Sequence, residues 1–183
     1  MSRLFTRDPL AHPEALIRRV YAYVAYRVGD GPDAEDVTSE VFERALRYRA
    51  SYDRAKGEPL GWLLGIARRC TSAALAARGV EALPTDLYHH EDGRDVEEES
   101  IRRLTLASAV GQLRERDQEL ISLRYGADLT AGQIARILDL EKNAVEVALH
   151  RALGRLRTIL ESEDPGPAEK ADGRRPLTRT SPL

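Results

Sequence analysis

Residues 129–157, LTAGQIARILDLEKNAVEVALHRALGRLR, restrict the possible folds of this chain more than any other segment. Thr130 and Gln133 have the spacing of a capping box, in which each side chain hydrogen-bonds the other residue's backbone amide at the start of a helix. Leu129 and Ile134 have the spacing of the hydrophobic staple that accompanies such a start. The segment therefore predicts a helix that begins next to Thr130.

This helix is predicted to end at Asp139, because aspartate tolerates the left-handed backbone of a tight turn. A second helix follows, with a helical repeat of apolar residues that we expect to be buried: Val145, Leu149, Ala152, Leu153, Leu156 and Leu160. Its other face carries Glu146, Val147, His150, Arg151, Gly154 and Arg155. Two helices around a short turn are typical of a DNA-binding helix-turn-helix, but also of other helical hairpins, so this unit alone leaves both open.

Helical periodicity also runs through the first part of the chain, where we expect helices at residues 15–26, 33–48 and 60–78. Their expected buried residues are Leu16, Val20, Tyr23, Val24, Val37, Val41, Ala45, Leu46, Leu63, Ile66, Ala67, Cys70 and Ala74. The single cysteine, Cys70, is interpreted as a core residue rather than a redox sensor. The pattern resumes at residue 100, so the sequence predicts an all-α fold.

Charge divides the chain into four parts. Residues 1–79 and 100–161 are mildly basic, whereas residues 80–99 carry eight acidic residues and one basic residue, together with Pro and Gly. We therefore expect two small helical domains joined by a flexible acidic linker, the second ending in the helix-turn-helix. Residues 162–183 are rich in Pro, Gly and charge and are expected to form a disordered tail.

Several classes of function are disfavoured. No apolar run is long enough to span a membrane, and the first residues lack a signal-peptide pattern, so we expect a cytoplasmic protein without direct membrane insertion. The chain has no phosphate-binding Gly loop and no nucleophile motif, and His89 and His90 lack a further patterned ligand. We expect no enzyme activity, no metal and no cofactor.

An acidic face and a basic loop remain as candidate surfaces. Asp36, Glu40 and Glu43 share one outer face of the second expected helix, which is either a solvated surface, with Glu40 paired to a following arginine, or a contact surface. The loop RASYDRAKGEP after it carries cations and an aromatic ring. It is either an ordinary connection or a site that binds phosphates and stacks a base.

Four motifs, DAEDVTSEVFERAL, YDRAKGEPLGWLLGIARR, LRERDQELISLRYGADLTAGQIARIL and NAVEVALHRALGRLR, occur in an order and spacing that resemble bacterial RNA polymerase sigma factors. The likeness is to the extracytoplasmic-function (ECF) subfamily of the sigma-70 family and covers roughly residues 13–79 and 100–161. It implies a subunit that binds core RNA polymerase, directs it to a promoter and helps to open the duplex. It also implies an anti-sigma factor as a further partner.

The resemblance assigns roles to particular residues. Polymerase contacts would be Asp33, Glu35, Asp36 and Glu40. The unpaired strand of the minus-ten element would contact Tyr52, Arg54, Lys56, Trp62, Arg68 and Arg69. Trp62 has an alternative interpretation as a core residue. The minus-thirty-five element would contact Thr130, Lys142, Asn143, Glu146, Val147, His150, Arg151 and Arg155. Acids fit a base-reading surface because glutamate accepts a hydrogen bond from cytosine N4.

The sequence departs from the common family pattern at several of these positions. Glu146, Val147 and Ala148 stand where many members have Lys, Ser and Arg, so a promoter preference cannot be transferred. The linker would either thread the polymerase or act only as a tether. Two alternatives are a stand-alone helix-turn-helix regulator that needs no polymerase and a helical adaptor that never touches DNA.

Overall fold

The computed structural model describes residues 8–78 and 105–163, and every regular element in these ranges is a helix or a helical turn. The all-α prediction is therefore confirmed for this part of the chain. None of its helices is both long and apolar enough to cross a membrane. The expected acidic linker lies outside the described residues, as do His89, His90 and residues 164–183 of the expected tail. The last helix ends at Glu163, slightly beyond the expected domain end at residue 161.

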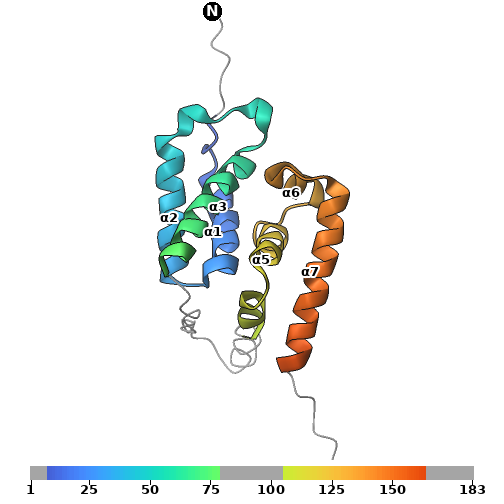
Figure 1. Ribbon diagram of the computed structural model, residues 1–183. Helices are drawn as coiled ribbons and strands as arrows, with labels where there is room; N and C mark the ends of the chain where they lie inside the picture. The colour runs from blue at the N-terminus through green and yellow to red at the C-terminus, as the bar shows by residue number, and fades with distance from the viewer. Residues whose placement is uncertain (1–7, 79–104, 164–183) are drawn as a thin grey trace, which may run out of the picture.

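Three long helices form the first unit, and each begins at a proline: α1 (Pro13–Val28), α2 (Pro32–Arg47) and α3 (Pro59–Arg78). Proline suits a first helical turn because the N–H that it lacks would have no partner there. Two short 3-10 turns, η1 (Arg49–Ser51) and η2 (Arg54–Lys56), connect α2 to α3. Figure 1 shows these three helices packed side by side, with the connection at one end of the unit.

The core of this unit follows the predicted apolar faces closely. Val20, Tyr23 and Val24 of α1 are fully buried, and so are the predicted residues Val41, Ala45, Leu63, Ala67 and Cys70. Burial raises the pKa of the Cys70 thiol, which agrees with its interpretation as a neutral core residue. The expectation for Leu46 is wrong, since its side chain is 60% exposed. Leu46 follows Ala45 by about 100° around the helix, which turns it out of the buried stripe.

The second unit begins with helical residues 105–111 and continues with α5 (Glu115–Ile121), the π-helical turn η3 (Ser122–Gly126), α6 (Ala131–Leu138) and α7 (Lys142–Glu163). Both hydrogen bonds of the predicted capping box are present at Thr130 and Gln133. Asp139 has the predicted left-handed conformation, with φ 54° and ψ 51°. The helix-turn-helix geometry is therefore confirmed.

The predicted apolar stripe of α7 is buried at Val145, Leu149, Ala152 and Leu156. Leu153 departs from the prediction and is 37% exposed. It lies at the margin of the buried stripe, where it lines a shallow surface hollow with Leu156 and Leu160. Leu160 is half-buried near the end of the helix.

The two units also pack directly against each other, which the sequence did not predict. α1 contacts α5 and η3, and α3 contacts α6 (Figure 1). As a result, residues of both units belong to one hydrophobic core, in which Val20 and Leu63 join Leu120, Leu123 and Ile134. The candidate surfaces of the two units are therefore held close to each other.

Candidate nucleic-acid interface

The outer face of α7 carries most of the residues predicted to read DNA. Lys142, Asn143, Glu146, Val147, His150 and Arg151 are all exposed. They face away from the core because Val145, Leu149 and Ala152 fix the opposite side of the helix. Lys142 Nζ lies 3.4 Å from Glu146 Oε1, and both side chains remain more than half exposed. Such a surface pair is weak and can be exchanged for contacts with a ligand.

Arg155 has a different environment from the other arginines of this helix. Its Nε and Nη2 donate to the two carboxylate oxygens of Asp117 at 2.8 and 2.7 Å. The Asp117 side chain is only 7% exposed, so Arg155 supplies the opposite charge and two hydrogen bonds to a nearly buried carboxylate. The hydrogen bond to Asp117 raises the pKa of Arg155. The geometry thus gives Arg155 a role in joining α7 to α5.

Thr130 is exposed, but its hydroxyl takes part in the start of α6. Thr130 Oγ1 accepts from the Gln133 backbone N–H at 3.3 Å and lies 3.0 Å from Gln133 Oε1. Gln133 Oε1 in turn accepts from the Thr130 backbone N–H at 2.9 Å. The side chain therefore sets where the first helix of the helix-turn-helix begins.

The basic loop is held in shape by Tyr52. Its hydroxyl donates to the Gly57 carbonyl at 3.0 Å, and its ring lies 5.6 Å from the Trp62 ring at an interplanar angle of 59°. Trp62 is half-buried and packs on the core, and part of its side chain reaches the surface. Arg54 and Lys56 are exposed on η2. Tyr52 of the loop and Trp62 of α3 thus form a small aromatic platform beside two cations.

A cleft of about 300 Å³ separates this platform from α6. Tyr52, Lys56 and Trp62 line one side, and Gln133, Arg136 and Ile137 line the other. The predicted residues Arg54, Arg68 and Arg69 do not line it. The candidate minus-ten surface therefore faces the helix-turn-helix across this cleft.

Arg68 and Arg69 follow each other on α3 and have different environments. Arg69 is exposed. Arg68 is half-buried and donates from Nε to Glu119 Oε1 of α5 at 2.8 Å and from Nη1 to the Ile137 carbonyl of α6 at 3.4 Å. Arg68 thus contacts the second unit through two helices.

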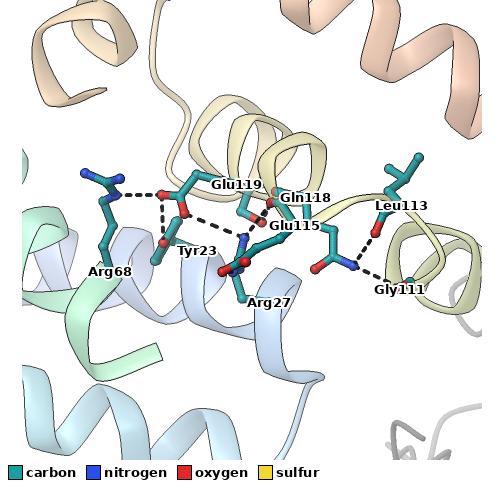
Figure 2. Close-up of polar contacts among 9 residues, drawn as sticks. Tyr23, Arg27, Arg68, Gly111, Leu113, Glu115, Gln118 and Glu119 are labelled. Atoms are coloured by element: carbon teal, nitrogen blue, oxygen red, sulfur yellow. Dashed lines mark hydrogen bonds and ion pairs between the residues drawn. The ribbon is translucent and has the colours of Figure 1, made fainter. Parts of the chain in front are cut away.

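Glu119 joins a cluster of charged and polar groups between the units (Figure 2). Its Oε1 accepts from the Tyr23 hydroxyl at 3.2 Å, and its Oε2 lies 3.6 Å from Arg27 Nη1. Arg27, with a side chain 1% exposed, also donates to the Glu115 carbonyl at 3.0 Å. Burial, with the nearby Glu119 charge, raises the pKa of Tyr23, so its hydroxyl remains a neutral donor. We call Tyr23, Arg27, Arg68, Glu115 and Glu119 the Glu119 cluster.

The predicted polymerase contacts lie along α2. Asp33, Glu35 and Asp36 are exposed in its first turns, where the helix dipole favours acids. Asp33 forms an ion pair with Arg78 of α3, and Glu40, which is half-buried, forms one with Arg44. This last pair confirms the intrahelical contact expected for Glu40. Leu46 at the end of α2 and Tyr48 after it add exposed apolar surface to this helix.

Sequence reasoning did not single out Asp117, Glu119 or Gly126. The two acids occupy ordinary positions of an amphipathic helix, and no local motif marks their long-range partners. Gly126 ends η3 against α1, where a Cβ would lie 2.8 Å from the Ala22 carbonyl oxygen. A glycine at the end of an apolar segment is a usual turn signal, so its role in packing was hidden.

Profile comparisons match two parts of the chain to sigma factor regions. Residues 14–79 match sigma-70 region 2, and residues 103–156 match sigma-70 region 4. Solved structures of other proteins share the fold, and two of them match most of this chain. The sigma factor RpoE of Bartonella quintana, in complex with the anti-sigma factor NepR, has a TM-score of 0.65 at 17% identity, over 81% of this chain and 94% of that chain. CnrH, in complex with the cytosolic domain of CnrY, has a TM-score of 0.56 at 21% identity, over 84% of each chain.

Curated relatives agree with these profiles. The ECF RNA polymerase sigma factor BldN of Streptomyces coelicolor is 31% identical, and the match covers 77% of this chain and 56% of BldN. The ECF sigma factor ShbA of Streptomyces griseus is 32% identical over 85% of this chain and 87% of ShbA. Sigma factors are not enzymes, which agrees with the prediction from the sequence. With region 2 and region 4 in order on one chain, this protein belongs to the ECF sigma factors, which direct RNA polymerase to promoters.

Proposed function

We propose that this chain binds core RNA polymerase through the exposed side of α2. The acids Asp33, Glu35 and Asp36 favour a basic partner surface, and their contribution will fall as salt increases. Leu46 provides an apolar contact at the other end of the helix. A surface that combines an uncovered leucine with a rim of charge is typical of protein interfaces.

We further propose that region 2 contacts the opened minus-ten strand. The Tyr52 and Trp62 rings offer stacking surfaces for unpaired bases, and Arg54 and Lys56 offer cations for phosphates. Arg68 and Arg69 extend this basic surface along α3. These groups suit single-stranded DNA because an unpaired base can leave the stack and lie against an aromatic side chain.

Region 4 is proposed to read the minus-thirty-five element with α7 in the major groove. Lys142, Asn143, Glu146, Val147 and His150 would face base edges, and Arg151 would contact the backbone. Thr130 and Arg155 support this surface by fixing α6 and α7. The observation that carries the whole proposal is the exposed, mixed polar and apolar face of α7, presented after a capped helix and a left-handed turn.

The partners and location follow from this role. We propose residues 1–79 and 100–161 as the two functional domains, and the cytoplasm, where RNA polymerase acts, as the location. An anti-sigma factor is a further proposed partner. The fold shared with RpoE, which was solved in complex with the anti-sigma factor NepR, supports this proposal.

The test is a fluorescence anisotropy titration of the labelled chain with purified bacterial core RNA polymerase. We expect saturable one-to-one binding, and Asp36→Arg should weaken it by about tenfold or more through charge repulsion. Glu14→Arg is the matched control, because it makes the same charge change on an exposed part of α1.

Two results would contradict the proposal. No binding by the folded wild-type chain would remove the polymerase-binding role. Equal losses for Asp36→Arg and Glu14→Arg would remove α2 as the docking surface and leave only a general effect of charge.

A further inference from the structure

Lys142 and Glu146 form a pair of opposite charges in the first two turns of α7. Lys142 Nζ lies 3.4 Å from Glu146 Oε1, and the two side chains are 68% and 51% exposed. Among the described residues, neither side chain has another ion pair or side-chain hydrogen bond. A pair that is this exposed contributes little to the stability of the fold. Both charged groups are therefore available to a ligand.

The pair lies in the part of α7 that reaches deepest into DNA in a helix-turn-helix. α7 begins at Lys142, shortly after the left-handed turn at Asp139. In such units the first residues of the second helix contact base edges, whereas the first helix crosses the backbone. The pair has no net charge, so it adds little attraction to phosphates. Its contribution to promoter binding is therefore in the choice of sequence.

The two charged groups match the major-groove edge of a single C·G base pair. Cytosine presents its N4 amino group as a donor, and the guanine paired with it presents O6 and N7 as acceptors. N4 and O6 are hydrogen-bonded to each other and lie about 2.9 Å apart. The Glu146 carboxylate and the Lys142 ammonium have a similar separation of 3.4 Å. One base pair can therefore satisfy both groups while their own ion pair persists.

The other base pairs fit this arrangement less well. In the same orientation, a G·C pair places guanine acceptors against the Glu146 carboxylate, and a T·A pair places thymine O4 there. An A·T pair offers the adenine N6 donor, but the adjacent N7 repels the carboxylate and the thymine methyl group obstructs Lys142. Only a C·G pair gives the carboxylate a donor and the ammonium two acceptors.

We propose that Lys142 and Glu146 act as one unit that selects a C·G base pair in the minus-thirty-five element. The proposal rests on the role assigned above to α7 in reading that element, and it names the base pair that two of its residues require. The ion pair already holds the two groups near the required spacing, so little ordering is needed on binding. A mismatched base pair at this position should weaken binding by about tenfold.

The test uses the full-length chain assembled with core RNA polymerase. The holoenzyme first selects a promoter from random duplex DNA. Each base pair of its minus-thirty-five element is then replaced by the other three, and fluorescence anisotropy measures the competition between the fragments. For the wild-type chain we expect one position at which C·G is bound about tenfold more tightly than G·C.

The decisive variant combines Lys142→Glu with Glu146→Lys, which exchanges donor and acceptor and keeps the total charge. We expect its preference at that position to reverse from C·G to G·C, with an unchanged dependence on salt. Glu146→Gln should instead shift the preference towards A·T, because glutamine pairs with adenine. The exchange also places glutamate before lysine at the start of the helix, an order that favours helix formation, so the variant should fold. Circular dichroism checks this.

Arg157 and Glu161 provide the matched control. They form an exposed pair on the same helix, with the same spacing in sequence and the same order of charges, and Arg157 Nε lies 2.7 Å from Glu161 Oε1. Arg157→Glu combined with Glu161→Arg should leave the preference at every base pair unchanged.

Three outcomes would overturn the proposal. One is a wild-type holoenzyme that selects a minus-thirty-five sequence without a preferred C·G pair. Another is a C·G preference that survives the exchange of Lys142 and Glu146. The third is an exchanged variant, shown to be folded, that loses the same affinity for all four base pairs. Failure of the proposed function is read separately, because the wild-type chain would then not bind core RNA polymerase or its holoenzyme would select no minus-thirty-five sequence.

Discussion

Arg151 and Arg155 lie one turn apart on α7 but have different contacts. Arg151 is exposed on the face that is proposed to meet DNA, whereas Arg155 is held by both oxygens of the buried Asp117 carboxylate. The sequence pattern placed both on one polar face and predicted both as DNA contacts. It could not separate them, because Asp117 is distant in sequence and no local spacing connects it to Arg155.

We therefore predict different outcomes for the two alanine variants. Arg151→Ala should leave thermal stability unchanged, weaken duplex binding for all sequences and reduce the salt slope of log K by about one unit. Arg155→Ala should lower the thermal midpoint, because the buried Asp117 charge loses its partner, and Arg155→Lys should recover only part of it. The measurements are a salt titration of DNA binding and thermal unfolding by circular dichroism. Equal stability of the two variants would contradict the structural role of Arg155.

At the scale of elements, the helices with strong local signals were the predictable ones. The capping box at Thr130, the left-handed turn at Asp139 and the apolar stripe of α7 all follow from interactions within a few residues. The π-helical turn η3 was not predictable in the same way. Its five residues follow α5 without a local signal of their own, and Gly126 at its end packs tightly against the α1 backbone.

The capping box allows a prediction about α6. Thr130→Ala removes the side-chain acceptor for the Gln133 N–H and should lower the free energy of unfolding by about 1 kcal/mol. Urea denaturation of the full-length chain measures this change. Thr158→Ala is the matched control on the exposed C-terminal part of α7, where the hydroxyl contacts only the Gly154 carbonyl of its own helix and the change should stay within about 0.5 kcal/mol. A loss of DNA binding by Thr130→Ala with unchanged stability would instead favour a direct DNA contact.

At the scale of the whole molecule, charge and composition indicated two helical domains but not their contact. The acids and arginines that contact each other in the Glu119 cluster are 51 or more positions apart along the chain, as in the pair of Arg68 and Glu119. Each residue alone fits an ordinary helix surface. Complementary packing of two such surfaces is a three-dimensional property, and the helical repeat specifies only which side of each helix is apolar.

The direct contact between the two helical units makes a prediction for the complete promoter complex. Fluorescent labels on Ser39→Cys of α2 and Ser162→Cys of α7, in a Cys70→Ala background, report the distance between the two helices by energy transfer. This labelled chain is assembled with core RNA polymerase and a promoter fragment selected from random DNA by that holoenzyme. We expect energy transfer to fall well below the value of the free chain, because elements roughly 85 Å apart cannot be bound by touching domains. Since binding and opening are linked, Gly126→Ala should also form this complex at a lower concentration than wild type, while Gly132→Ala should not. If the free chain and the promoter complex give the same energy transfer, the two domains are already separate in solution. Their contact then has no part in promoter binding.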